Sequence, residues 1–321
     1  MPIRLIDADL HSHSCISDGT LTPSAVVRRA VEHGVRLFAL TDHDQLGGVA
    51  EARVEARRLG VGFVAGVEVS VSWRDETVHI LGLHVDSANR TLVDGLAATR
   101  GGREERARSI ARALADAGIP GAWEGALRHT RNPAMLSRTH FARFLVERGV
   151  CRDTREVFRR FLVEGKPGHV PHRWATLGDA VGWIVGAGGV AVIAHPARYR
   201  FDARAMEAFV DEFTAAGGRG IEVVCSSHGR DEQRRFAQLA RSRDLLASRG
   251  TDFHDPEDVR VQFGRLVPLP EDLTPVWHDW PEAMALVAGD GAQAGAGAGV
   301  AREKGVDTGG ADAGAYSGSG Q

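Results

Sequence analysis

The sequence predicts an α/β protein in which parallel strands alternate with helices. Short apolar segments of strand length alternate with amphipathic segments of helical length near both ends of the chain. Strands that are connected through helices lie parallel, and these connections are right-handed. In such folds the chemistry collects at the carboxyl ends of the strands. Histidine and acidic residues follow several of the expected strands, so we expect one site there.

The N-terminal part supplies four of the expected strands. Thr22 and Pro23 are typical of a helix start, with an N-cap followed by proline, and Gly34 is a typical helix stop. The predicted strands cover residues 3–10, 37–40, 63–65 and 78–83, and the predicted helices cover residues 22–33 and 49–59. Each of these strands leads to a histidine or glutamate, at His11, His43, Glu68 and within the last strand at His79.

The same alternation returns in the C-terminal part. Helices are predicted at residues 177–187, 205–216 and 231–243, and strands at 190–194, 221–224 and 245–247. The first of these strands ends at His195, and the last leads to Asp252 and His254. Two regions of β/α pattern, at residues 1–99 and 174–288, therefore predict a single barrel-like domain.

The middle of the chain breaks this rhythm and predicts a helical insertion at residues 100–173. Its expected helices cover residues 104–117, 138–148 and 154–162. It holds sixteen Lys and Arg against eight Asp and Glu, while the whole chain has a formal net charge of −3. That count alone favours an ordinary solvated surface over a lid that receives phosphate. Phe141, Phe144 and Phe161 have helical spacing and are expected in a core, as are Trp73 and Trp174.

The remaining bulk properties exclude several classes. The net charge gives no general reason to expect nucleic acid or membrane binding. No apolar run reaches membrane-spanning length, and the start of the chain lacks the apolar segment of a signal peptide. Cys15, Cys151 and Cys225 have neither zinc-site nor disulfide spacing, which favours a reducing, cytoplasmic location. The Gly- and Ala-rich tail at residues 289–321 is expected to be disordered.

The strongest chemical signal is a set of imidazole and carboxylate side chains, most of which follow predicted strands. The set comprises His11, His13, Asp18, His43, Glu68, His79, His195, Asp252 and His254. Such side chains bind divalent Zn, Mn and Fe. His11 and His13 alternate along an extended chain, so both point to one side, and Asp252 and His254 repeat the spacing. One such pair is more often structural, but its recurrence favours a metal site, and the absence of thiolates favours an open catalytic one.

These ligands are too many for one ion with an open position, so we expect two or three divalent ions. A cluster of this kind lowers the pKa of water and holds the attacking and leaving oxygens of an in-line displacement. Phosphoester hydrolysis has these requirements. Amide or ring hydrolysis also occurs at paired metals, so the ligands alone leave the reaction open.

Five segments, in this order, resemble the PHP (polymerase and histidinol phosphatase) superfamily: DADLHSHSCISDG, ALTDHD, GVEVS, AHP and GTDFHD. The resemblance covers residues 3–280 and implies a distorted seven-stranded β/α barrel with a trinuclear metal site. Manganese is the expected metal, with zinc or iron as alternatives. The resemblance implies one ion at His11, His13, Glu68 and Asp252, a second at Glu68, His79 and His195, and a third at Asp18, His43 and His254. Ala197 departs from the glycine that often follows AHP.

Three insertion segments, PGAWEGAL, SRTHFARFLVERG and VEGKPGHVP, are similar to the branch of 3',5'-nucleoside bisphosphate phosphatases, which includes 5'→3' exoribonucleases. This implies removal of a 3'-phosphate from a nucleoside 3',5'-bisphosphate, or release of mononucleotides from short 5'-phosphorylated RNA. Both substrates carry a free phosphate beside the bond that is cut. We predict that Arg138, His140, Lys166 and Arg173 bind it, because Arg and Lys are the usual phosphate ligands. With the resemblance, a basic lid becomes the better interpretation of the insertion.

His195 is also a candidate proton donor to the leaving 3'-oxygen. Arg198, His228 and Glu222 are expected to be polar groups without a special role. Three alternatives stay open: a phosphatase for another small monoester such as histidinol phosphate, a hydrolase of C–N bonds, and a noncatalytic polymerase-associated PHP module. The basic insertion disfavours the first two, and the complete ligand set together with the lack of a polymerase region disfavours the third. The oligomeric state stays open.

Overall fold

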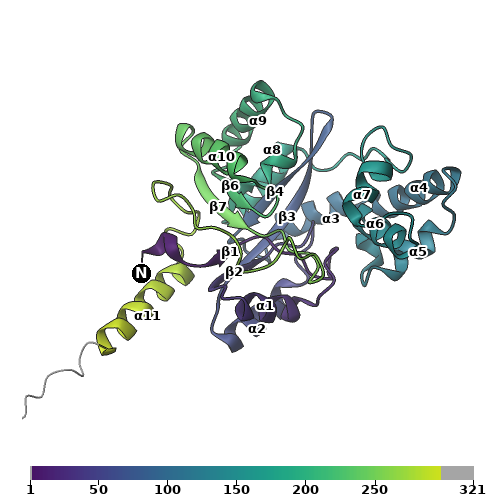
Figure 1. Cartoon of the computed structure of the whole chain (residues 1–321). Helices are drawn as coiled ribbons and strands as arrows, with labels where there is room; N and C mark the ends of the chain where they lie inside the picture. The colour runs from purple at the N-terminus through teal and green to yellow at the C-terminus, as the bar shows by residue number, and fades with distance from the viewer. Residues whose placement is uncertain (1, 298–321) are drawn as a thin grey trace, which may run out of the picture.

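A seven-stranded sheet forms the centre of the protein in a computed structural model that describes residues 2–297 (Figure 1). The strands are neighbours in chain order. They are β1 (Ala8–Asp9), β2 (Leu37–Leu40), β3 (Gly62–Trp73), β4 (Glu76–Leu83), β5 (Val190–Ile193), β6 (Gly220–Cys225) and β7 (Leu246–Gly250). The backbone N–H of Leu10 donates to the carbonyl of Arg249 at 3.1 Å, and that of Asp252 donates to His11 at 2.8 Å. The first strand therefore meets the last, and the predicted seven-stranded β/α barrel is confirmed.

β4 runs antiparallel to both β3 and β5, whereas the sequence pattern predicted parallel strands throughout. β3 continues to Trp73, which pairs with Glu76 across a two-residue turn. Arg74 in this turn has a φ of 51°, which suits a tight hairpin. A hairpin of this length cannot hold a crossover helix, so the strand must reverse. The other pairs, β1–β2, β2–β3, β5–β6 and β6–β7, are parallel as predicted.

Six helices of the β/α units cover the sheet. They are α1 (Pro23–Glu32), α2 (Val49–Leu59), α3 (Arg90–Arg100), α8 (Leu177–Gly186), α9 (Ala203–Ala215) and α10 (Arg230–Ser242). The expected cap is present, since the side chain of Thr22 accepts a hydrogen bond from the N–H of Ala25. Residues 3–10 do not form one strand as predicted: a 3₁₀ turn, η1 (Ile3–Leu5), precedes the short β1. A second such turn, η4 (Pro196–Arg198), follows β5.

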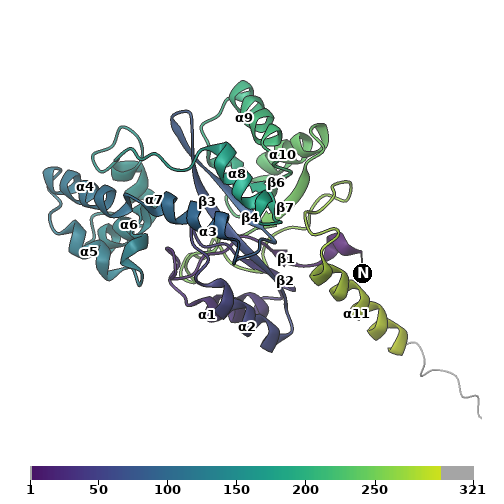
Figure 2. The ribbon, with the colours of Figure 1, turned by 180° about the vertical axis from the view of Figure 1, so that it is seen from behind.

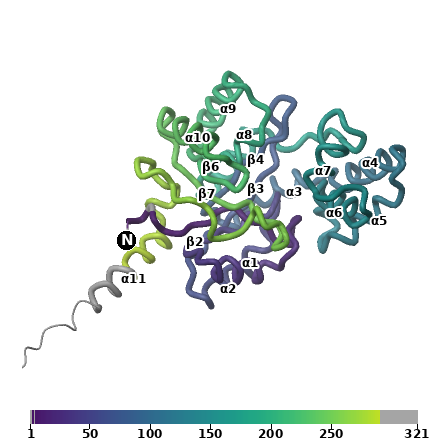
Figure 3. Tube along the Cα trace, viewed as in Figure 1, coloured from purple at the N-terminus to yellow at the C-terminus, as the bar shows by residue number. Residues whose placement is uncertain are grey.

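The last described helix, α11 (Pro281–Gly297), packs against η1 and β3. Figure 3 shows the N-terminal segment beside it. α11 includes residues 289–297 of the Gly- and Ala-rich tail; the rest of the tail lies outside the described residues, and its expected disorder stays a prediction. Within residues 2–297 no helix is both long enough and apolar enough to span a lipid bilayer.

The helices between α3 and α8 gather to one side of the barrel, as Figures 1 and 2 show from opposite directions. They are α4 (Arg103–Asp116), α5 (Ala122–Arg128), η2 (Pro133–Met135), α6 (Arg138–Glu147), α7 (Thr154–Val157) and the π-helical turn η3 (Phe158–Leu162). They enclose a second hydrophobic cluster that includes Leu114, Phe141 and Leu145, separate from the barrel core. Phe141, Phe144 and Trp73 are buried as expected, whereas Phe161 and Trp174 are only partly buried.

Gly250 is the point at which barrel closure leaves no room for a side chain. A Cβ there would lie 2.3 Å from the Cβ of His11 and 2.7 Å from its backbone nitrogen. Overpacking of this kind costs about 1–3 kcal/mol, so Gly250→Ala lowers the melting temperature of the metal-free protein by several degrees. Circular dichroism measures the shift.

Gly182→Ala in α8 is the matched control, because a Cβ added at Gly182 would meet nothing within 4 Å. Alanine is the better helix former by about 1 kcal/mol, so this variant melts at or above the parent temperature. A Gly250→Ala variant that melts with the parent would contradict the tight contact between β1 and β7.

Candidate metal centre

The predicted ligands converge at the carboxyl ends of the barrel strands. His11 and His13 follow β1, His43 follows β2, His195 follows β5, and Asp252 and His254 follow β7. Glu68 and His79 lie on the paired strands β3 and β4. Their side chains form three overlapping groups: His13, Asp18, His43 and His254; His11, His13, Glu68 and Asp252; and His43, Glu68 and His79.

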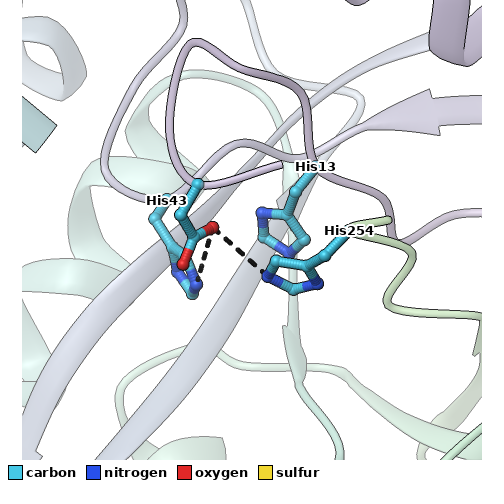
Figure 4. Close-up of side chains that lie close together, drawn as sticks. His13, His43 and His254 are labelled. Carbon is cyan, nitrogen blue, oxygen red and sulfur yellow. Dashed lines mark ion pairs between the residues drawn. The ribbon is translucent and has the colours of Figure 1, made fainter. Parts of the chain in front are cut away.

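The first group is open to solvent on one side. The Oδ1 of Asp18 lies 3.2 Å from the Nε2 of His254 and 3.9 Å from the Nε2 of His43. Figure 4 shows these rings and that of His13 converging, with the two ion pairs dashed. The rings of His13 and His254 stack with their centroids 4.1 Å apart. His43 and His254 are partly exposed, so a ligand from outside can reach this end.

The second group is completely buried. The Nε2 of His11 lies 3.3 Å from both Glu68 and Asp252, and the Nε2 of His13 lies 3.2 Å and 3.1 Å from the same two carboxylates. Two imidazoles therefore face two carboxylates across a space that a metal ion can fill. This arrangement follows from the alternation of His11 and His13 in the extended chain after β1.

The third group shares Glu68 and extends to β4. The Oε1 of Glu68 lies 2.9 Å from the Nδ1 of His79 and 2.8 Å from the Nε2 of His195. Its Oε2 lies 3.0 Å from the Nδ1 of His43. The structure thus places His195 at this group, on the same carboxylate oxygen as His79.

Several ligand atoms in these groups are buried without a hydrogen-bond partner among the described residues. They include the Nε2 atoms of His11 and His13, the Nδ1 of His43, the Oδ1 of Asp18 and the Oε2 of Glu68. Buried polar atoms are nearly always satisfied in folded proteins. Imidazole nitrogens and carboxylate oxygens that face one another in this way are satisfied by shared divalent cations. The side chains therefore fit a cluster of divalent metal ions.

The charges of the site demand a cation. Burial lowers the pKa of His13, but hydrogen bonds with Asp252 and Glu68 raise it to about 10. Burial also opposes ionisation of Glu68, yet His43, His79 and His11 hold its pKa well below the usual range. The carboxylates are thus ionised and need positive charge beside them, which a proton or a metal ion supplies. Metal binding at these histidines must release protons.

His195 has a different environment. Burial and the nearby Arg198 lower its pKa to about 3, although Glu68 acts in the opposite direction. Its backbone has a φ of 27°, and its N–H donates to the Oε2 of Glu222 at 2.5 Å. A neutral imidazole in a fixed orientation suits a metal ligand, and it has no extra proton to give at neutral pH.

Sequence reasoning missed the role of Glu222. This fully buried residue of β6 places its Oε1 3.0 Å from the Nδ1 of His11, and its Oε2 holds the backbone of His195. Carboxylates in this position fix the tautomer and orientation of a metal-binding histidine. Nothing local in the sequence marks Glu222, because its partners are 211 and 27 residues away.

Two arginines beside the site were also missed. Arg198 contacts the Oδ2 of Asp252 with its Nη2, and its side chain as a whole is 45% exposed. Arg143 of α6 lies 4.0 Å from Asp255, and its Nη1 is buried without a hydrogen-bond partner among the described residues. Ser137, Arg143 and the predicted His140 recur every three residues on α6, so they share one face of the helix.

His140 lies beside the first group, but one of its ring nitrogens is already bonded at the start of its own helix. Its Nδ1 accepts a hydrogen bond from the N–H of Ser137, and Ser137 Oγ lies 3.2 Å from the Oδ2 of Asp18. Burial lowers the pKa of His140 to about 4, so the ring is neutral. His140 thus touches Asp18 only through Ser137 among the described residues, and its contact with a phosphate stays a prediction.

Of the other three predicted phosphate ligands, Arg138 lies near a second arginine without a carboxylate partner, Arg106. Arg138 is partly buried and donates to the carbonyl of Leu162 at 3.3 Å. Burial, together with the charges of Arg138 and Arg103, lowers the pKa of nearby Arg106 to about 9. Lys166 and Arg173 are exposed. In the described part of the chain, no carboxylate pairs with Arg106, Arg138, Lys166 or Arg173.

Comparisons with known proteins agree with this geometry. Residues 9–121 match the PHP domain. The 3',5'-nucleoside bisphosphate phosphatase of Chromobacterium violaceum is 51% identical over 86% of this chain and 96% of its own length. The 5'-3' exoribonuclease Rnm of Salmonella typhimurium is 42% identical over 85% of this chain and 94% of its own.

Among solved structures, an amidohydrolase from Chromobacterium violaceum, with bound sulfate and no metal, superimposes with a TM-score of 0.83 at 51% identity. The likeness covers 87% of this chain and 96% of that one. The chain belongs to the PHP family, in the group that includes the 3',5'-nucleoside bisphosphate phosphatase and the Rnm exoribonucleases.

Proposed function

We propose that this protein is a divalent-metal-dependent phosphoesterase that removes the 3'-phosphate of nucleoside 3',5'-bisphosphates or releases mononucleotides from short 5'-phosphorylated RNA. The observation that carries the proposal is the position of an overlapping ligand cluster beside an insertion in which Arg106 and Arg138 have no carboxylate partner among the described residues. Such a site binds one phosphate where it is cut and a second where it is held. The names of the two relatives described above support the same substrates.

We propose three metal ions per chain, with manganese as the native metal. We assign the ligands to the ions as the resemblance implies. In support, the side-chain groups overlap, Glu68 is common to the second and third groups, and the Nε2 of His195 lies 2.8 Å from Glu68. Divalent cations supply Lewis acidity toward phosphoryl oxygens and lower the pKa of the water that they bind. We assign His195 to metal binding rather than to protonation of the leaving oxygen, because its pKa of about 3 leaves it neutral.

Side chains of the protein orient the substrate and supply positive charge to its phosphoryl oxygens. Arg198 is fixed by Asp252 and its side chain as a whole is 45% exposed, so its free N–H groups can donate to phosphoryl oxygens of a bound substrate. The insertion, residues 100–173, acts as the lid over the second phosphate, with Arg138, Lys166 and Arg173 as its ligands and Arg106 added from the structure. His140 helps to place Ser137 against Asp18.

The uncompensated arginines favour phosphoester over C–N bond hydrolysis, because a neutral amide substrate gives them no anion. They likewise disfavour a noncatalytic module. The sulfate in the related structure is an anion of phosphate shape, which supports an anion site in this group of proteins. The three cysteines are buried and unpaired, in keeping with the proposed cytoplasmic location.

Parallel rate measurements test the activity. Adenosine 3',5'-bisphosphate, adenosine 3'-monophosphate, adenosine 5'-monophosphate and a 5'-phosphorylated oligoribonucleotide are incubated with the Mn²⁺-loaded protein. We expect phosphate release from the bisphosphate or nucleotide release from the oligomer, and much slower turnover of the monophosphates, because they lack the second phosphate. Prior chelation should remove the activity and Mn²⁺ should restore it. No turnover of any substrate would refute the proposal.

Asp252→Asn tests the buried ligand group. The amide cannot match the negative charge that faces His11 and His13, so we expect kcat to fall at least 100-fold and the metal content to fall by at least one ion. Elemental analysis of the purified protein measures the second effect. Asp258→Asn is the control and keeps both values, because the Asp258 carboxylate accepts hydrogen bonds from the backbone and side chain of Arg260, outside the ligand groups.

Arg138→Met tests the second phosphate site. One phosphate contact to Arg contributes about 1.5–3 kcal/mol, so we expect KM for the bisphosphate to rise at least tenfold. KM for adenosine 3'-monophosphate should stay unchanged, because this substrate lacks the 5'-phosphate. Arg152→Met, an exposed residue of the same insertion, is the control. Equal effects of Arg138→Met on both substrates would contradict the assignment.

A further inference from the structure

The insertion reaches the metal centre through one buried ion pair. Arg103, the first residue of α4, is only 6% exposed, and its Nη2 contacts the Oδ2 of Asp44 and lies 3.5 Å from the Oγ of Ser70. The face of its guanidinium lies 4.5 Å from the ring of Trp174, which fixes its plane. A charged side chain is rarely this buried unless it is paired.

Asp44 lies at the junction of the two segments that carry His43 and Glu68. It directly follows His43, and its N–H donates to the carbonyl of Glu68 at 2.8 Å. Its carboxylate accepts hydrogen bonds from the backbone N–H and the Oγ of Ser70, at 2.7 Å and 2.9 Å. Ser70 is in turn the β3 partner of His79 on β4. Asp44 thus touches the backbone around three of the ligands without belonging to a ligand group.

The backbone of Asp44 is held in an uncommon conformation. Its φ of 47° falls in the left-handed region, which a non-glycine residue keeps only when its surroundings fix it. Part of that fixation comes from the insertion side, since the Nη1 of Arg100 donates to the carbonyl of Asp44 at 2.6 Å. Arg103 is the cation that pairs with its fully buried carboxylate in the described part of the chain.

We infer that Arg103 is a positioning residue of the metal centre: by neutralising Asp44 it keeps His43 and Glu68 in their ligand geometry, and it couples the insertion to metal binding. The inference rests on the proposed metal dependence and adds a role that no ligand motif assigns. Loss of Arg103 leaves a buried, unpaired carboxylate next to His43. The strained turn then relaxes, and the ions that His43 and Glu68 share bind less tightly.

Calorimetric titration of the chelated full-length protein with Mn²⁺ alone tests this inference without any substrate. We expect Arg103→Met to weaken the most weakly bound ion at least tenfold. Arg103→Lys keeps a positive charge near Asp44 and should recover most of the affinity. Arg112→Met, on the same helix but exposed and bonded only to Ser109, is the matched control and should titrate like the parent.

The charge pair gives a sharper criterion. Asp44→Asn leaves Arg103 buried without its partner and should also weaken Mn²⁺ binding. The double variant Asp44→Asn/Arg103→Met removes both charges, so its loss should be at least fivefold smaller than the product of the two single losses. Independent, multiplicative losses would overturn the inference, and so would parent-like affinity in Arg103→Met.

Two further outcomes are separated by design. If Arg103→Met does not fold, the Mn²⁺ titrations of Arg103→Lys and Asp44→Asn test the inference instead. If both variants bind Mn²⁺ like the parent, the inference is overturned. If the parent itself binds no Mn²⁺, the proposed metal dependence fails together with this inference. Parent-like Mn²⁺ binding combined with inactivity on all substrates would refute the proposed activity and leave the role of Arg103 intact.

Discussion

A single buried carboxylate, that of Glu68, constrains the arrangement of the whole site. It is inaccessible to solvent, and its two oxygens lie within 3.3 Å of nitrogens from five histidines: His11, His13, His43, His79 and His195. An ionised carboxylate in a dry interior is unfavourable unless positive charge surrounds it. The strands that meet around β3 supply those histidines. The barrel geometry therefore determines how much positive charge can surround Glu68. Divalent ions supply this positive charge without protonation of the histidines.

The insertion meets the barrel site on two sides. α4 brings Arg103 to Asp44, and α6 brings Ser137 to Asp18. Between these contacts lie cations that no carboxylate of the described chain neutralises, Arg106 and Arg138 foremost. An anion bound there would relieve their mutual repulsion. The residues that contact Asp44 and Asp18 thus lie close in sequence to these unpaired cations, at the starts of α4 and α6.

Features that depend on residues close together in the sequence could be predicted from it. The HxH spacing, the TDHD segment and the strand-ending histidines predicted the ligand set, because alternation in an extended chain determines which side chains share a face. The reversal of β4 was missed because a two-residue turn leaves little compositional trace between Trp73 and Glu76. Glu222, Arg103 and Arg143 were missed for another reason: their partners are distant in sequence, and no spacing rule connects them.

Barrel closure has a consequence for the timing of synthesis. The first ligands follow β1, but Asp252 and His254 follow β7, and β1 acquires its second neighbour only when β7 is in place. A ribosome makes the chain from the N-terminus, so a nascent chain shorter than about 250 residues lacks the closed sheet and two of the three ligand groups, and holds only His43, Glu68 and His79 as a full group. The last part of the ligand cluster and the last contact of the sheet are therefore completed by the same stretch of chain, β7 and the residues after it.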